Sequence, residues 1–184
     1  MPAMNATPTQ AARVLSKADP RLGRLIARVG SCRLTIEALQ SPFQALAEAI
    51  VYQQLTGKAA ATILGRVVDL FRPKRFPSPQ DILGAPESRL RGAGLSRAKV
   101  AAIKDLAART LDGTVPSLAA LRNMQEEEIV TRLTAIRGVG RWTVEMLLIF
   151  RLGRPDVLPV GDYGIRKGFA RAFGTRALPT PQQI

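Results

Sequence analysis

The sequence contains no histidine, and Cys32 is its single cysteine. A lone cysteine cannot form an intramolecular disulfide bond, and without histidine there is no ligand set for a zinc site or a cysteine-ligated iron–sulfur cluster. The longest apolar run, Met146–Phe150, is far too short to span a membrane, and residues 1–10 lack the apolar core of a secretion signal. We therefore expect a protein with no membrane partner and no metal, cytoplasmic in a bacterium or nuclear in a eukaryote.

Acidic residues are scarce relative to basic ones. The chain of 184 residues has 14 Asp and Glu against 27 Lys and Arg, which gives a net charge of +13. A surplus of this size favours a polyanionic partner, most often nucleic acid. A ribosome-associated protein or a generally basic proteome would show the same surplus, so charge alone does not identify the function.

The alternation of polar and apolar residues that is typical of β-strands is also missing, and helical signals take its place. Asp19 and Gly30 are typical of the start and the stop of one helix. Ser41 predicts the start of another, which would run to Leu55 and be ended by Thr56-Gly57. The start of the chain is expected to be disordered. Further helices are predicted around residues 11–16, 58–71, 78–84, 86–92, 96–113, 116–122 and 123–136. The fold class is therefore all-α.

Two glycines enclose Val139 between two predicted helices. Asn123 can cap the first helix, which would end at Gly138, and the second would begin at Gly140 or Arg141, so the connection is very short. Glycine allows the backbone angles of such a turn and the close approach of another molecule. The N–H groups at the start of the second helix lack helical partners, and a phosphate can bind several of them.

An ordinary corner between two helices, in which glycine only stops the first, is the alternative. The positive charge of the chain and the apolar spacing of Leu133, Ile136 and Val139 favour DNA binding instead. We predict contacts to a DNA backbone, without readout of its sequence, from Gly138, Val139, Gly140, Arg141 and Thr143.

The pattern from Leu133 to Gly140 resembles the helix-hairpin-helix motif. The downstream segment from Pro159 through Asp162 to Arg166 resembles the P-x-x-D-x-x-I-R/K segment that follows this motif in the helix-hairpin-helix, glycine/proline, aspartate (HhH-GPD) superfamily of DNA glycosylases. Within that superfamily, G140-R-W-T and A49-I-V-Y-Q-Q-L55 are most similar to the DNA-3-methyladenine glycosylase II branch. The larger bacterial member of that branch has an extra amino-terminal mixed α/β domain for which 184 residues leave no room, so the chain resembles the compact form. The resemblance covers roughly residues 41–173.

The resemblance implies an all-α fold of two closely packed helical subdomains with the active-site cleft between them, within a single unit of residues 1–184. One subdomain would be residues 35–150, with the helix-hairpin-helix at 123–150. The other would combine residues 1–34 with 151–184. The family normally continues into a further helix rich in aromatic residues, so the carboxy-terminal part is expected to be shorter than usual.

The resemblance also implies a monofunctional DNA glycosylase, an N-glycosyl hydrolase that starts base excision repair. It would flip alkylated bases such as 3-methyladenine, and also 7-methylguanine, ethenoadenine or hypoxanthine, out of double-stranded DNA. Asp162 would be the catalytic carboxylate, kept ionised by a helix start and by Arg166 or Lys167. An anion beside C1′ stabilises the positive charge that develops on the sugar. The usual role of an aspartate in this position is only to cap a helix, and Asp156 is a nearby competitor.

Members of the superfamily that also nick DNA carry a lysine nucleophile at the position of Trp142. Tryptophan cannot form a Schiff base, so the resemblance implies base release without strand cleavage. Trp142 would line the base pocket with Tyr52, Tyr163 and Met146, where an electron-rich ring attracts a cationic purine. Its spacing with Met146 and Ile149 fits packing in a helical core equally well.

A flipped base leaves a gap in the duplex that a side chain must fill. By resemblance this wedge is Gln54, with Gln53 as the second choice, although both also suit a polar helix end. The resemblance implies no cofactor, leaves room for a structural monovalent cation at the hairpin, and predicts a monomer that binds damaged double-stranded DNA. The competing hypothesis is a non-catalytic helix-hairpin-helix module that binds or bends DNA, in which Asp162 is only a cap.

Overall fold

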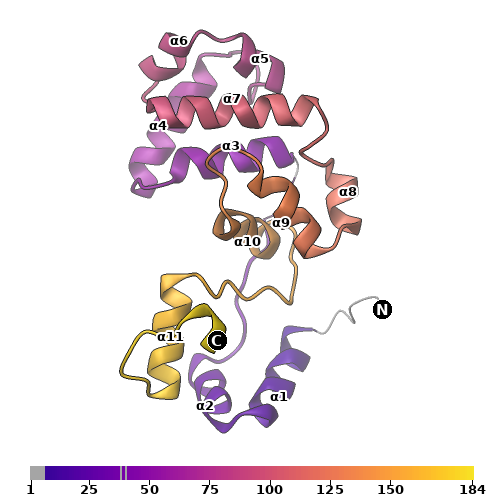
Figure 1. Cartoon of the computed structure of the whole chain (residues 1–184), viewed down its shortest axis with the longest axis vertical. Helices are drawn as coiled ribbons and strands as arrows, with labels where there is room; N and C mark the ends of the chain where they lie inside the picture. The colour runs from indigo at the N-terminus through magenta and orange to yellow at the C-terminus, as the bar shows by residue number, and fades with distance from the viewer. Residues whose placement is uncertain (1–6, 38, 40) are drawn as a thin grey trace. The chain divides into compact units, whose positions relative to one another are not determined.

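A computed structural model describes residues 7–37, 39 and 41–184. Within these residues the chain forms eleven α-helices, one short 3₁₀ helix and no β-strand (Figure 1). The all-α prediction is therefore confirmed for the described part of the chain. The predicted disorder at the start of the chain falls on residues 1–6, which lie outside the described residues. No helix among those described is long and apolar enough to cross a membrane.

The chain divides into two compact units. The smaller unit combines Met1–Glu37 with Leu148–Ile184, and the larger unit is Ala38–Leu147. The helices of the smaller unit are α1 (Pro8–Ala18), α2 (Pro20–Val29), α11 (Tyr163–Phe173) and the 3₁₀ helix η1 (Pro181–Gln183). The larger unit contains α3 (Pro42–Tyr52), α4 (Gly57–Asp69), α5 (Pro79–Gly84), α6 (Glu87–Gly92), α7 (Arg97–Leu111), α8 (Leu118–Asn123) and α9 (Glu126–Thr134). Helix α10 (Arg141–Phe150) begins in the larger unit and ends in the smaller one.

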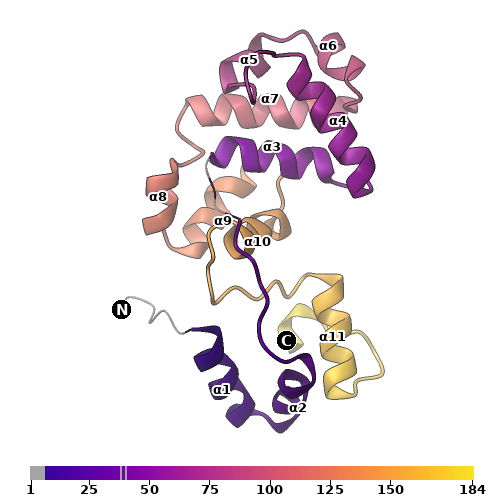
Figure 2. The ribbon, with the colours of Figure 1, turned by 180° about the vertical axis from the view of Figure 1, so that it is seen from behind.

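Helices α3 and α7 form the centre of the larger unit. They lie side by side in both views (Figures 1 and 2), and α4 packs against α3 while α5 and α6 pack against α7. Burying one aliphatic side chain of this size contributes about 1.5–3 kcal/mol. The largest fully buried side chains of this unit are Leu46, Ile50, Val51, Ile82, Leu90, Ile103, Leu106, Leu121, Ile129, Leu133 and Ile136. Because this core extends to Leu133 and Ile136, the turn that follows them is fixed to it.

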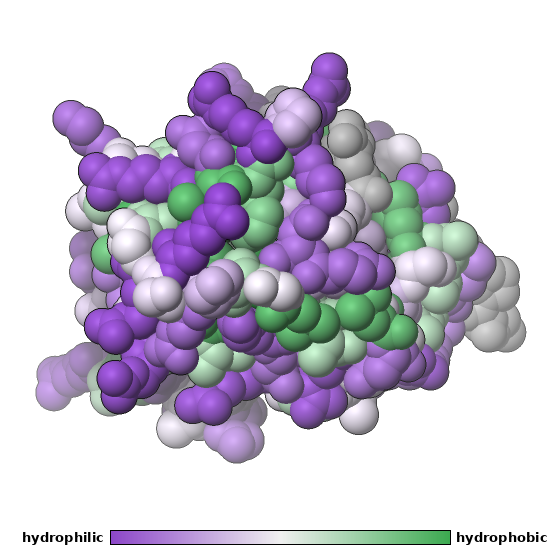
Figure 3. Space-filling model, turned by 90° about the horizontal axis from the view of Figure 1, so that it is seen from above, coloured by the Kyte–Doolittle hydropathy of each residue, from purple (hydrophilic) through white to green (hydrophobic). Residues whose placement is uncertain are grey.

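Hydrophilic side chains cover most of the face that Figure 3 shows, with smaller apolar patches between them. In Figure 1 the same end of the molecule carries α5 and α6. Exposed arginines on α6 and at the start of α7 include Arg89, Arg91 and Arg97. These three positive charges are thus at the surface, where they can attract a polyanion.

Most helix starts follow the sequence prediction. The Asp19 carboxylate accepts the N–H groups of Arg21 and Leu22 at 2.7 and 2.9 Å, and α2 ends at Gly30 with a φ of 79°. Ser41 caps α3 in the same way. Each such cap contributes about 1 kcal/mol. Serine also caps α5, α7 and α8, through Ser78, Ser96 and Ser117.

The prediction for the end of α3 was wrong. Helix α3 ends at Tyr52, and the Thr56 hydroxyl accepts the N–H of Ala59 at 3.4 Å as the cap of α4. Gly57 is the first residue of α4. Thr56 and Gly57 therefore open the next helix, because a threonine cap outweighs the tendency of glycine to stop a helix.

The predicted boundaries of the helix-hairpin-helix also differ from the structure. Asn123 does not cap α9: it is the last residue of α8, and its side-chain amide donates to the carbonyl of Ala119 at 3.2 Å. Gln125 precedes α9 without a side-chain cap bond. Helix α9 ends at Thr134, so residues 135–140 form the connection, longer than predicted.

The smaller unit is less tightly packed. Helix α2 contacts both α1 and α11, yet no side chain of these three helices is buried. The Arg21 guanidinium donates to the carbonyl of Phe173 at 3.1 Å and lies 5.9 Å from the centre of its ring. Phe169 stacks on Phe173 with ring centres 4.2 Å apart. Polar and aromatic contacts thus connect these helices.

Candidate nucleic-acid interface and carboxylate

The hairpin, defined as residues 135–140 between α9 and α10, consists of two consecutive turns. The N–H of Ile136 donates to the carbonyl of Leu133, and the N–H of Val139 donates to the carbonyl of Ile136, both at 3.1 Å. Leu133, Ile136 and Val139 are buried. Gly138 has a φ of 78°, a conformation that costs a residue with a β-carbon about 1–2 kcal/mol. A rigid core on one side and a glycine in the turn therefore shape the hairpin.

Helix α10 presents its first backbone N–H groups beside the hairpin. The N–H of Val144 donates to the carbonyl of Gly140 at 3.2 Å and closes the first turn. The N–H groups of Arg141, Trp142 and Thr143 precede this bond, at the positive end of the helix dipole, which is the arrangement that binds a phosphate. Gly140 is exposed, and a β-carbon there would meet nothing within 4 Å. Thr143 is 8% exposed, so it presents little surface of its own to a ligand.

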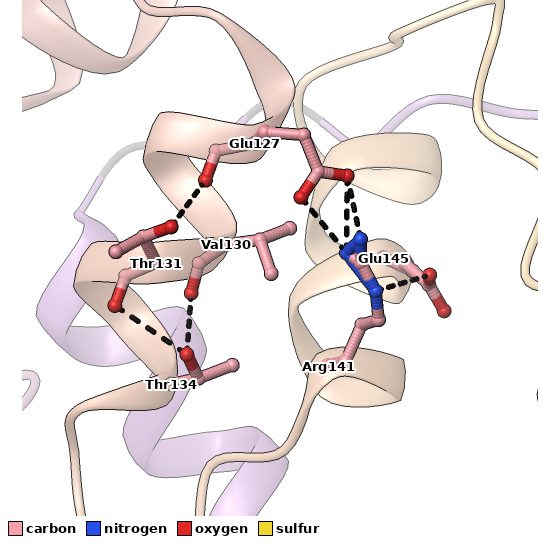
Figure 4. A network of polar contacts seen from close by, with 6 residues as sticks. All are labelled: Glu127, Val130, Thr131, Thr134, Arg141 and Glu145. Atoms are coloured by element: carbon pink, nitrogen blue, oxygen red, sulfur yellow. Dashed lines mark hydrogen bonds and ion pairs between the residues drawn. The ribbon is translucent and has the colours of Figure 1, made fainter.

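The side chain of Arg141 lies between two carboxylates in Figure 4. One of its terminal nitrogens donates to both oxygens of Glu127, at 3.1 and 3.2 Å, and its Nε lies 3.7 Å from the Glu145 carboxylate. The positive charge at the start of α10 is thus compensated in the free protein. Since the Glu127 side chain is 76% exposed, the pair contributes at most about 1 kcal/mol. Breaking this pair would therefore cost little if Arg141 binds a phosphate, as the sequence predicts.

Replacing Glu127 with glutamine should strengthen binding to undamaged duplex DNA by about two- to fivefold, because it removes the anion that competes with phosphate for Arg141. Fluorescence anisotropy with a labelled duplex at low salt measures this. The matched control is Glu128→Gln, which changes the net charge equally but releases Arg132, its partner at 3.1 Å within α9. An equal gain in both variants would mean that only net charge matters.

A second exposed turn, the wedge turn, is formed by residues 52–55 at the end of α3. The N–H of Leu55 donates to the carbonyl of Tyr52 at 3.3 Å and closes it. Gln54 has a φ of 56°, and no other described residue apart from glycine has a positive φ. Such strain is typical of functional turns. The side chain of Leu55 is exposed too, and the sequence prediction did not include it.

Gln53 has a different role from its neighbour Gln54. Its side-chain amide donates to the carbonyl of Gly138 in the hairpin at 2.9 Å. The Lys99 ammonium of α7 donates to the carbonyls of Val51 and Gln53, at 2.7 and 2.8 Å. Burial lowers the pKa of Lys99, as it does for lysine nucleophiles, but two carbonyls hold this ammonium in a structural role. The wedge prediction therefore rests on Gln54 and not on Gln53.

Asp162 caps α11 in the smaller unit. Its Oδ1 accepts the N–H of Ile165 at 2.9 Å, and its own N–H donates to the carbonyl of Pro159 at 2.9 Å. These bonds fix the carboxylate at the positive end of the α11 dipole, where an anion is stabilised. A β-carbon on Gly164 would lie 3.0 Å from Oδ1, so this glycine leaves room for the carboxylate. The sequence prediction did not include Gly164.

The basic residues after Asp162 have contacts that the sequence did not predict. The Nε of Arg166 donates to the carbonyl of Pro179 at 2.7 Å, and the Lys167 ammonium lies 5.8 Å from the centre of the Tyr163 ring. Arg166 thus holds the segment after α11. Asp156, the competing carboxylate, is exposed on the loop before Asp162.

The aromatic residues predicted for a base pocket are exposed. Trp142 is 50% exposed, Tyr52 41% and Tyr163 65%, whereas Met146 is partly buried. Half of the Trp142 side chain is accessible, which argues against the alternative that it packs in a helical core. Tyr52, Trp142 and Met146 belong to the larger unit, and Tyr163 lies beside Asp162 in the smaller one.

The chain is similar to DNA repair proteins in sequence and in structure. A family model described as "HhH-GPD superfamily base excision DNA repair protein" matches residues 47–184. DNA-3-methyladenine glycosylase 1 of Schizosaccharomyces pombe is 36% identical over 178 residues, which are 96% of this chain and 78% of that protein. The alkylbase DNA glycosidase-like protein mag2 of the same yeast is 31% identical over 176 residues, 95% of this chain and 83% of that protein.

Two solved structures resemble the fold over most of the chain. The S. pombe 3-methyladenine DNA glycosylase Mag1 in complex with abasic DNA has a TM-score of 0.79 at 36% identity, and the match covers 94% of this chain and 84% of that one. A DNA-3-methyladenine glycosidase from Bacillus halodurans has a TM-score of 0.82 at 33% identity, with 93% and 77% covered.

Proposed function

The chain belongs to the HhH-GPD superfamily of base excision DNA repair proteins, and we propose that it is a DNA glycosylase that removes alkylated bases from double-stranded DNA. The observation that carries this proposal is its 36% identity, over 96% of the chain, to a protein named DNA-3-methyladenine glycosylase. The local geometry supports it. The start of α10 offers N–H groups to a phosphate, and the start of α11 carries a fixed carboxylate.

The catalytic role is proposed for Asp162 on the strength of its place in the P-x-x-D-x-x-I-R/K segment that the family shares, and the reaction needs a carboxylate. When the N-glycosidic bond breaks, its electron pair goes to the base and positive charge develops on the sugar. The Asp162 carboxylate stabilises this charge and accepts a proton from the water whose oxygen bonds to C1′. An alkylated base such as 3-methyladenine carries positive charge and becomes neutral as it accepts the electron pair. It therefore leaves without the strong acid that a normal base needs.

The residue at the nucleophile position supports a monofunctional enzyme. Trp142 stands where strand-nicking members of the superfamily carry a lysine, and an indole cannot form a Schiff base with the sugar. Lys99, whose pKa is lowered by burial, donates to two backbone carbonyls instead. The product is then an intact strand with an abasic site.

The exposed aromatic rings are proposed to receive the flipped base. Trp142, with Tyr52 and Met146 on the same unit, would offer a ring face to the cationic purine, an attraction of about 0.5–2 kcal/mol. Tyr163, exposed beside Asp162 in the smaller unit, is the candidate aromatic residue of that unit. Gln54, on the strained and exposed wedge turn, would fill the gap in the duplex.

A monovalent cation at the hairpin would bind backbone carbonyl oxygens. The carbonyls of Ile136 and Gly138 already accept hydrogen bonds from Val139 and Gln53. A carbonyl oxygen has a second lone pair, so the hairpin is compatible with such an ion. The described residues contain no cluster of three or more His, Cys, Asp or Glu side chains that could hold a metal ion.

A single-turnover assay tests the proposal with duplexes that carry 3-methyladenine, 7-methylguanine, 1,N6-ethenoadenine or hypoxanthine. Each reaction is analysed with and without alkali before electrophoresis. We expect strand breaks only after alkali, since alkali cleaves at an abasic site. Breaks without alkali would show lyase activity. Tight duplex binding without base release would favour the non-catalytic module, for which the cap at Asp162 is the whole role of that residue.

A further inference from the structure

Contacts between α3, α7 and the hairpin connect the two segments that the proposed enzyme brings to DNA. We propose that Gln53, Lys99 and Asp105 are positioning residues that hold the wedge turn in a fixed relation to the hairpin, so that the wedge reaches the duplex where its backbone is bound. The inference rests on the proposed function, because it concerns how a base is flipped.

The direct connection is the side chain of Gln53. Its backbone belongs to the wedge turn, and its amide donates to the carbonyl of Gly138 in the hairpin at 2.9 Å. The bond joins two segments far apart in the sequence, and it is made by a backbone oxygen of the glycine whose φ of 78° shapes the hairpin. A shift of the wedge turn is thereby transmitted to the hairpin.

Helix α7 supports both segments from one face. Lys99, Ala102 and Asp105 follow one another at intervals of three, a spacing that makes each side chain the neighbour of the next on the helix surface. The Lys99 ammonium donates to the carbonyl of Gln53 at 2.8 Å, and the Asp105 Oδ2 accepts the N–H of Arg137 at 2.8 Å. Ala102 lies under the hairpin, since a β-carbon on Gly138 would be 3.2 Å from that of Ala102.

The spacing between the two segments matters because flipping combines two events. The hairpin binds the backbone while the wedge enters the space that the base has left, and unstacking a base costs a few kcal/mol. A wedge displaced by about 1 Å cannot compensate this cost, and displacements of that size can reduce a rate by about 10²-fold. The three side chains can thus control flipping without touching DNA.

Gln53→Met tests the proposal, because methionine keeps the length of the side chain and removes the donor. Gln44→Met on α3 is the matched control, since it removes the bond from Gln44 to Glu48 of 2.9 Å instead. For each protein we would measure the melting temperature, the affinity for undamaged duplex, the affinity for a duplex with a tetrahydrofuran abasic-site analogue, and single-turnover base release.

Gln53→Met should lower both the preference for the tetrahydrofuran duplex and the rate of base release at least tenfold. Its melting temperature and its affinity for undamaged duplex should stay close to those of Gln44→Met. Unchanged preference and rate would overturn the proposal. A uniform loss of stability and of all binding would also overturn it, because Gln53 would then be needed only for folding.

A pair of substitutions on α7 provides the second test. Asp105→Asn keeps an oxygen that can accept the N–H of Arg137, and it should retain the preference for the tetrahydrofuran duplex. Asp105→Leu removes that acceptor, and this variant should lose the preference for the tetrahydrofuran duplex. Equal behaviour of the two variants would contradict a positioning role for Asp105. If the proposed function is wrong, the wild type itself will release no base. The preference for the tetrahydrofuran duplex can still be measured in that case, because it does not depend on base release.

Discussion

Asp162→Asn is expected to remove base release while duplex binding and folding stay nearly unchanged. Asparagine lacks the negative charge that stabilises the developing positive charge on the sugar, and loss of one such group costs about 10²–10³-fold in rate. Asparagine caps helices about as well as aspartate, so it can keep the bond to the N–H of Ile165. Single-turnover base release, duplex affinity and thermal melting of the variant measure the three effects.

The chain provides a control for this experiment. Asp156 is an exposed aspartate in the loop that precedes Asp162, and Asp156→Asn makes the same chemical change there. We expect this variant to release base at the wild-type rate. If Asp156→Asn is inactive and Asp162→Asn is active, the catalytic carboxylate is misassigned. If Asp162→Asn only melts earlier, the residue is a cap and the non-catalytic alternative gains support.

Gly138→Ala should destabilise the protein by about 1–2 kcal/mol and weaken duplex binding at least tenfold. The residue has a φ of 78°, where a β-carbon is strained, and that β-carbon would lie 3.2 Å from the β-carbon of buried Ala102. A chain of this size should melt about 2–8 °C lower as a result. The hairpin would have to move away from α7, which also lengthens the bond from Gln53.

Gly140→Ala distinguishes an effect on the stability of the hairpin from an effect on how closely its backbone approaches DNA. Gly140 is not among the described glycines with positive φ, and a β-carbon there meets nothing within 4 Å, so the melting temperature should not fall. Duplex affinity should fall nonetheless, because a methyl group would stand between the start of α10 and the phosphate. Gly84→Ala, in an equally open position at the end of α5, is the control. Wild-type affinity of Gly140→Ala would show that the main chain does not approach the backbone closely here.

Local chemistry made much of the fold predictable from the sequence. Asp19, Ser41 and Ser96 cap helices because their side chains accept an N–H from the first turn, and this information lies within a few residues. The cap at Asp162 is of the same kind. Thr56 shows the limit of such rules. The sequence suggested that Thr56 and Gly57 end α3, whereas Thr56 caps α4.

The contacts that organise the candidate site could not be predicted in this way. Gln53 bonds to Gly138, and Asp105 bonds to Arg137, across long stretches of sequence that carry no pattern for either contact. The pairing of Arg141 with Glu127 likewise depends on how α9 and α10 pack. Gly164 is an exception, because a glycine two residues after a capping aspartate is visible in the sequence.

The division of the chain has a consequence for the order of folding during synthesis. The larger unit is one continuous stretch, Ala38–Leu147, whereas the smaller unit needs both Met1–Glu37 and Leu148–Ile184. A ribosome completes the larger unit first, and a domain generally folds once its sequence has emerged. The hairpin can therefore fold before Asp162 has emerged from the ribosome, so that the proposed phosphate-binding turn would form before the proposed catalytic carboxylate is in place.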